Sequence, residues 1–167
     1  MIVSGPSPPV SGSVETVDDV STIGGAVVAV ASTSTTHPRP DGALTDMRVL
    51  IVDDSRVMRM LLRKMVNELG IDDIVEAGDG QEALELVDSH VPDLAMVDWN
   101  MPVMNGVEFV AALRERRDCD RVKVMMVTSE SDPRQVDEAL KAGADEYAMK
   151  PMDREILADK LLLMGLG

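Results

Sequence analysis

Acidic, hydroxyl and basic side chains follow four short apolar segments of this 167-residue chain, each at the point where the segment ends. In chain order these side chains are Asp53 and Asp54, Asp98, Thr128 and Lys150. Short apolar runs of this kind are typical of strands covered on both faces of a parallel sheet. Because the carboxyl ends of parallel strands meet at one edge, where open α/β sheets bind ligands, we expect the five side chains to lie together.

The five side chains together offer chemistry that no one of them offers alone. Neighbouring carboxylates repel one another unless a cation lies between them, and a site made of oxygen ligands suits Mg²⁺. A hydroxyl and an ammonium group are what the free oxygens of a phosphoryl group require. We therefore predict that Asp98 is a nucleophile that becomes an aspartyl phosphate. The alternative for a single Asp, a helix or turn cap, does not explain its four companions.

The elements that must position these groups alternate regularly between strands and helices, as in a doubly wound α/β fold with a five-stranded parallel sheet and five helices. The predicted strands cover residues 47–52, 73–77, 93–97, 122–127 and 145–149. The predicted helices cover residues 55–68, 81–89, 106–117, 132–142 and 153–163. In the first helix, the apolar residues near helical spacing are Val57, Met60, Leu61, Met65 and Leu69.

The segment Asp98-Trp99-Asn100-Met101-Pro102, followed by Asn105-Gly106, resembles the receiver domain of two-component response regulators. Within that family it is most similar to the single-domain chemotaxis regulators of the CheY type. The acidic pair Asp53-Asp54, the segment Val127-Thr128-Ser129-Glu130 and Lys150-Pro151 extend the likeness over residues 47–167. The chain departs from the family at Met152, where Phe is common, and in the long segment that precedes the domain.

The resemblance implies a strand order of 2-1-3-4-5 and a phosphoryl group that Asp98 accepts from a histidine kinase. It implies a Mg²⁺ site in which Asp54, Asp98 and the backbone carbonyl of Asn100 bind the ion directly. Asp53 is expected to act through a water molecule bound to the metal.

The resemblance also assigns a switch. Lys150 pairs with Asp98 and then with a phosphoryl oxygen, and the Lys150–Pro151 bond is expected to be cis. Thr128 is expected to move toward the phosphoryl group and donate its hydroxyl to it. The movement of Thr128 leaves a space into which Tyr147 can turn. Asn100 and Glu130 are expected to tune dephosphorylation. A target protein is expected on the face formed by the fourth helix, the fifth strand and the fifth helix.

Two other functions compete with a stand-alone switch. Aspartate-based phosphohydrolases also place an Asp at a strand end with Mg²⁺, but they carry a second Asp two residues later, where this chain has Asn100. We therefore expect no turnover of a separate substrate. A relay intermediate that passes phosphate to another histidine protein would use the same site, so this alternative stays open.

Composition limits the remaining possibilities. Residues 1–46 are rich in Ser, Thr, Gly and Pro and are expected to be a disordered tail, whose apolar run 23–30 is too short to span a bilayer. The net charge of −14 argues against nucleic acid as a partner. The single cysteine, Cys119, fits a reducing cytoplasm. Because the sequence ends shortly after the fifth helix and leaves no room for a DNA-binding domain, we expect the output to be protein binding. We also expect a monomer.

Overall fold

The computed structural model describes residues 44–129 and 132–167 of the chain. The predicted disorder of residues 1–43 and the predicted role of Glu130 therefore lie outside the described residues. The tail prediction is wrong at its end, because Leu44–Asp46 form a short 3-10 helix, η1. The Met47 N–H donates to the Leu44 carbonyl (3.2 Å), and Leu44 packs against the core.

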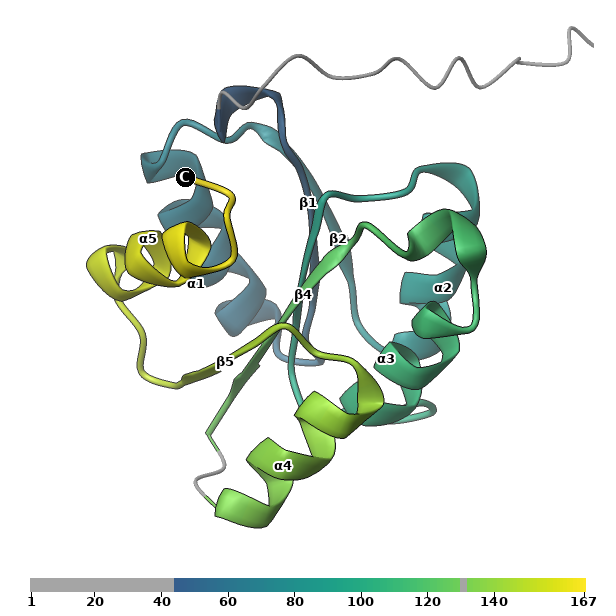
Figure 1. Ribbon diagram of the computed structural model, residues 1–167. Coiled ribbons are helices and arrows are strands. Elements are labelled where there is room, and N and C mark those ends of the chain that lie inside the picture. The colour runs from purple at the N-terminus through teal and green to yellow at the C-terminus, as the bar shows by residue number, and fades with distance from the viewer. Residues whose placement is uncertain (1–43, 130–131) are drawn as a thin grey trace, which may run out of the picture. The chain divides into compact units, whose positions relative to one another are not determined.

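Five parallel strands form one sheet in the order β2-β1-β3-β4-β5, which confirms the fold class and the strand order (Figure 1). The strands are β1 (Arg48–Val52), β2 (Asp73–Ala77), β3 (Leu94–Val97), β4 (Lys123–Thr128) and β5 (Glu146–Met149). The predicted bounds agree with these to within one residue at each end.

The helices are α1 (Arg56–Glu68), α2 (Gly80–Ser89), α3 (Gly106–Arg114), α4 (Pro133–Ala142) and α5 (Arg154–Leu163). A side-chain cap precedes each of them: Ser55, Asp79, Asn105, Asp132 and Asp153. These side chains accept hydrogen bonds from otherwise unpaired N–H groups of the first turn, which explains why each helix begins where it does.

The third helix is shorter than predicted. It ends at Arg114 rather than at residue 117, and a separate 3-10 helix, η2 (Arg117–Cys119), follows an extended Arg116. The Arg114 side chain explains the break, since it donates to the carbonyls of Cys119 (3.3 Å) and Val122 (2.9 Å). These bonds hold the turn against α3 while Cys119 is fully buried.

Helices cover both faces of the sheet, with α1 and α5 on one side and α2, α3 and α4 on the other (Figure 1). Strand residues alternate between the two cores, as a pleated strand requires. In β1, for example, Leu50 and Val52 pack under α2 and α3, whereas Val49 and Ile51 pack under α1 and α5. The sheet is thereby fixed between two apolar layers, and its carboxyl edge is held rigidly.

The apolar residues of α1 that have helical spacing do not all pack against the sheet. Leu62 and Val66 are the residues that α1 buries, whereas Val57, Met60 and Leu61 are 64%, 59% and 49% exposed. Met65 and Leu69 also pack against the core, so the sheet covers only part of the apolar side of this helix.

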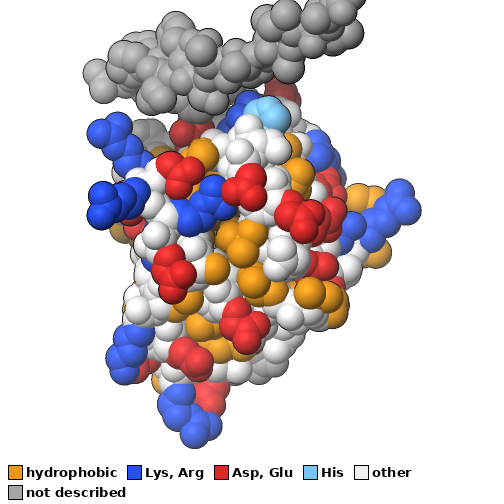
Figure 2. Space-filling model, turned by 90° about the vertical axis from the view of Figure 1, so that its right-hand side faces the viewer, with side chains coloured by type: hydrophobic (Ala, Val, Ile, Leu, Met, Phe, Trp, Pro, Cys, Tyr) orange, Lys and Arg blue, Asp and Glu red, His pale blue; other side chains and the backbone are white. Residues whose placement is uncertain are grey.

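No helix within the described residues, 44–129 and 132–167, is long and apolar enough to cross a membrane. Figure 2 views the domain from the side of α2 and α3, where acidic side chains surround a patch of apolar ones and basic side chains lie mostly toward the margins. This face lacks the clustered basic surface that binding to phosphate backbones requires.

Candidate functional site

The polar side chains predicted from the strand ends do meet at one edge of the sheet. Hydrogen bonds between backbone groups continue one residue past the strands. The Asp98 N–H donates to the Val52 carbonyl (2.8 Å), and the Lys150 N–H donates to the Thr128 carbonyl (2.8 Å). The Asp53 N–H is held in the same way by the Ala77 carbonyl (3.1 Å). The positions of these residues are therefore set by the sheet itself rather than by mobile loops.

The centre of the site is a buried cluster of three charges. The Lys150 ammonium donates to Asp53 Oδ2 at 2.6 Å and to Asp98 Oδ1 at 2.7 Å. The exposed fractions of these side chains are 12% for Lys150, 2% for Asp53 and 10% for Asp98. Lys150 was predicted to pair with Asp98, and the structure adds Asp53 as its second partner. Two carboxylates and one ammonium leave the cluster with one net negative charge.

Burial and neighbouring charges both perturb the ionisation of the cluster. Burial raises the pKa of the Asp98 carboxyl, and the nearby Asp53 carboxylate raises it further, although the hydrogen bond from Lys150 opposes both effects. Burial alone would lower the pKa of the Lys150 ammonium, but its bonds to Asp53 and Asp98 raise it above its usual value. The net negative charge of two carboxylates and one ammonium, rather than these pKa shifts, suits the site to an additional cation.

The raised pKa of Asp98 predicts that Asp98→Asn stabilises the metal-free protein near neutral pH. A carboxyl whose pKa is higher in the folded than in the unfolded state supports folding while protonated and loses that contribution as the pH rises through the folded-state pKa. The asparagine has no charge to bury. The Tm of the variant should therefore exceed that of the wild type at neutral pH.

Melting curves recorded in EDTA from neutral pH down to below 3.8, the ordinary pKa of an Asp carboxyl, would measure this difference. The difference should shrink as the pH falls, because both states of the wild type are then protonated at residue 98. A wild type that is more stable than the variant at neutral pH would contradict the raised pKa.

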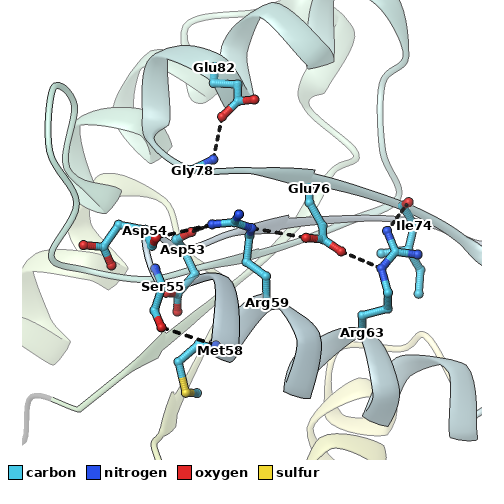
Figure 3. Close-up of polar contacts among 10 residues, drawn as sticks. All are labelled: Asp53, Asp54, Ser55, Met58, Arg59, Arg63, Ile74, Glu76, Gly78 and Glu82. Carbon is cyan, nitrogen blue, oxygen red and sulfur yellow. Dashed lines mark hydrogen bonds and ion pairs between the residues drawn. The ribbon is translucent and has the colours of Figure 1, made fainter.

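The loops beside the charge cluster fix the remaining carboxylate oxygens. The Asn100 N–H donates to Asp98 Oδ2 (3.1 Å), and the Ser55 N–H donates to Asp53 Oδ1 (2.8 Å). Asp54 differs from these two acids, because it is exposed and its side chain points away from that of Asp53 (Figure 3). Each Asp98 oxygen thus has a donor, and the carboxylate is held in one orientation.

An open pocket of about 800 Å³ gives access to these groups. Six of the predicted site residues line it, namely Asp53, Asp54, Asp98, Asn100, Thr128 and Lys150. Over residues 44–129 and 132–167, no three acidic, His or Cys side chains converge closely enough to hold an ion as they stand. The donor set nevertheless fits a hard divalent cation, since the cluster has excess negative charge and the exposed Asp54 also lines the pocket.

The chain matches the model of the response regulator receiver domain over residues 49–162. The chain belongs to the response regulator receiver domain family.

Individual relatives agree with this assignment. A chemotaxis protein CheY homolog of Campylobacter jejuni is 39% identical over 123 residues, which cover 72% of this chain and 95% of that protein. The chemotaxis protein CheY1 of Helicobacter pylori is 37% identical over 116 residues, which cover 69% and 94% of the two chains.

Solved structures show the same likeness. The structure of chemotaxis response regulator CheY4 of Vibrio cholerae has a TM-score of 0.65 at 34% identity, and the match covers 70% of this chain and 96% of that one. The CheX–CheY–BeF3–Mg²⁺ complex of Borrelia burgdorferi contains a chain with a TM-score of 0.67 at 27% identity, with coverage of 72% and 90%. Receiver domains of this type are signalling switches rather than enzymes with substrate turnover, and they generally bind Mg²⁺.

The two residues that were predicted to form the switch, Thr128 and Tyr147, have different surroundings. Thr128 is 1% exposed at the end of β4 and lines the pocket beside Lys150. Tyr147, on β5, is half-buried against the core of α2, α3 and α4, and it is not among the residues that line the pocket. The bond between Lys150 and Pro151 is cis, as the resemblance implied.

Arg59 on α1 contacts the site but was not predicted from the sequence. Its Nη1 donates to the Asp53 carbonyl (2.7 Å) and to the Asp54 carbonyl (3.4 Å), directly behind the acidic pair (Figure 3). The available signal was a basic residue within two turns of the acidic pair, but its direction on the helix was not predictable from spacing.

Proposed function

We propose that the protein is a CheY-type phosphorylation switch, in which Asp98 accepts a phosphoryl group from a histidine kinase and the domain then changes its affinity for a partner protein. The observation that carries the proposal is the buried Asp98 carboxylate, held by Lys150 at 2.7 Å at the mouth of an open pocket. A phosphate donor can reach Asp98 through the pocket, while the sheet keeps the carboxylate in place.

The chain's own residues supply positioning and charge rather than acid–base chemistry, which is what phosphoryl transfer requires. The Asn100 N–H orients Asp98 by donating to Oδ2, so that Oδ1 is the oxygen that Lys150 must release for attack. Lys150 retains its bond to Asp53 at 2.6 Å, and its ammonium is therefore already in place to receive a phosphoryl oxygen.

Asp53, Asp54, Asp98 and the Asn100 carbonyl would hold Mg²⁺. When bound, the ion neutralises charge that develops on the phosphoryl oxygens. Asn100 and Glu130 are proposed to control access of water to the phosphorylated residue.

The output is proposed to involve α4, β5 and α5. Each of these elements contributes an exposed apolar side chain: Leu140 on α4 is 48% exposed, Met149 on β5 is 50% exposed, and Ile156 on α5 is 41% exposed. Tyr147 lies on β5, the central element of the three, so that a turn of its ring changes this face directly. The relative of known structure in complex with CheX supports protein binding as the output.

The switch predicts that beryllofluoride with Mg²⁺ changes the environment of Tyr147. Because Tyr147 is the single tyrosine of the chain, biosynthetic fluorotyrosine gives one fluorine NMR resonance that reports on this ring. We expect a second resonance to appear on activation. Thr128→Ala should reduce its population, because the variant lacks the hydroxyl that binds the phosphoryl mimic.

Two controls make this result specific. Beryllofluoride added to Asp98→Asn should leave the resonance unchanged, and Mg²⁺ alone should not reproduce the activated spectrum. A wild-type fluorine resonance that stays unchanged at saturating beryllofluoride and Mg²⁺ would contradict the switch and favour the relay alternative.

A further inference from the structure

A cluster of charges behind the acidic pair is not used by the proposed phosphorylation chemistry. Arg59, in the second turn of α1, has a side chain that is only 18% exposed. Its Nη1 donates to the carbonyl oxygens of two consecutive residues, Asp53 (2.7 Å) and Asp54 (3.4 Å). One nitrogen of the Arg59 guanidinium thus contacts the backbone of both Asp53 and Asp54, whose side chains are proposed to bind the metal (Figure 3).

Glu76 on β2 fixes the direction of this guanidinium. Arg59 Nε donates to Glu76 Oε2 (3.2 Å), and Glu76 Oε1 accepts from Arg63 Nε on the next turn of α1. Arg63 Nη2 also donates to the Ile74 carbonyl (3.1 Å) on β2. Burial alone would raise the pKa of Glu76, but the hydrogen bonds and charges of Arg63 and Arg59 lower it, so the carboxylate stays ionised. The guanidinium therefore has an anchor on the edge strand of the sheet.

We propose that Arg59 is a positioning residue that holds the backbone of Asp53 and Asp54 in the orientation needed for Mg²⁺ binding. The inference rests on the proposed metal site. The Asp53 carbonyl lies in the peptide plane before the Asp54 Cα, and the Asp54 carbonyl lies in the plane after it. Fixing both carbonyls therefore fixes the direction in which the exposed Asp54 side chain leaves the backbone. Groups that orient metal ligands in this way commonly change metal affinity by about 10- to 100-fold.

The charge of Arg59 works in the opposite direction. A cation close to the metal site repels a second cation, so that its removal would tighten Mg²⁺ binding if charge were its only effect. Loss of positioning predicts weaker binding. The sign of the change therefore distinguishes a positioning role from a purely electrostatic one, and from a structural role that leaves metal affinity unchanged.

The test is a Mg²⁺ titration followed by the fluorescence of Trp99, the single tryptophan of the chain and the neighbour of Asp98. Arg59→Ala is expected to raise the Kd for Mg²⁺ by about 10-fold. Arg59→Lys should lie between this variant and the wild type, because Lys keeps the charge but lacks the fixed fork in which Nε binds Glu76 while Nη1 binds the carbonyls. Arg63→Ala is the matched control, since it removes an equal charge from the same helix and the same Glu76 partner without touching residues 53 or 54.

The outcomes separate the two proposals. A wild type without any Mg²⁺ response, by fluorescence or calorimetry, would overturn the metal site itself. A wild-type response that Arg59→Ala leaves unchanged or strengthens would overturn the role of Arg59 alone, as would an equal loss in Arg63→Ala. Urea unfolding in EDTA shows which variants are folded. If Arg59→Ala is unfolded, Arg59→Lys takes its place in the test. Weaker Mg²⁺ binding by Arg59→Lys then supports the proposal, and an unchanged Kd overturns it.

Discussion

Incubation with acetyl phosphate and Mg²⁺ is expected to add one phosphoryl group to the wild-type protein and none to the Asp98→Asn variant. The amide has nearly the shape of the carboxylate, but it has one acceptor oxygen where the carboxylate uses two, Oδ1 for Lys150 (2.7 Å) and Oδ2 for the Asn100 N–H (3.1 Å). It lacks the nucleophilic oxygen, so the loss should be complete. Intact-protein mass spectrometry measures it directly.

Asp79→Asn is the matched control for this experiment. Asp79 caps α2 by accepting from the N–H groups of Gln81 and Glu82, and Asn is an equally good cap, so this variant loses one carboxylate without losing stability. It should be phosphorylated like the wild type. Phosphorylation of Asp98→Asn at the wild-type rate would show that another residue is the acceptor.

The sheet and most of the site were predictable because they depend on features that short sequence segments carry. Buried parallel strands are short apolar runs, and their ends therefore locate Asp53, Asp98 and Lys150 to the residue. The carboxyl edge of a parallel sheet then brings those ends together without further information. The helix starts were equally readable, since Asp132 followed by Pro133 is a cap followed by the residue best suited to the first helical position.

Features that depend on side-chain direction were not predictable in this way. On α1, the apolar residues Val57, Met60 and Leu61 gave a helical pattern, yet packing selected Leu62 and Val66 for burial. Because the sequence did not show which side of α1 faces the sheet, the contact of Arg59 with Asp53 and Asp54 was not predicted either. Likewise, the early end of α3 depends on hydrogen bonds from Arg114 to the carbonyls of Cys119 and Val122, and no local sequence pattern predicts these bonds.

Gly106→Ala is expected to destabilise the domain by about 3 kcal/mol, the upper part of the range for overpacking. A Cβ at this position would lie 2.1 Å from the Asp98 carbonyl oxygen and 3.1 Å from its carbon. Neither partner can easily move. The Asp98 N–H is bound to Val52 on the neighbouring strand (2.8 Å), and the Gly106 N–H is bound to the Trp99 carbonyl (3.0 Å). Urea unfolding followed by circular dichroism measures the change.

Gly78→Ala is the matched control at the same edge of the sheet, because its new Cβ would meet only side-chain atoms, Glu82 Oε2 at 3.4 Å and Arg59 Nη1 at 3.9 Å. Its unfolding midpoint should stay near that of the wild type.

In Gly106→Ala the conflict is with the backbone of the phosphoacceptor itself. To relieve it, α3 must move away from the end of β3 and carry the loop of residues 99–105 with it. Any Gly106→Ala protein that remains folded at low temperature should therefore accept phosphate from acetyl phosphate more slowly than the wild type. A variant with wild-type stability would mean that α3 does not approach Asp98 as closely as described.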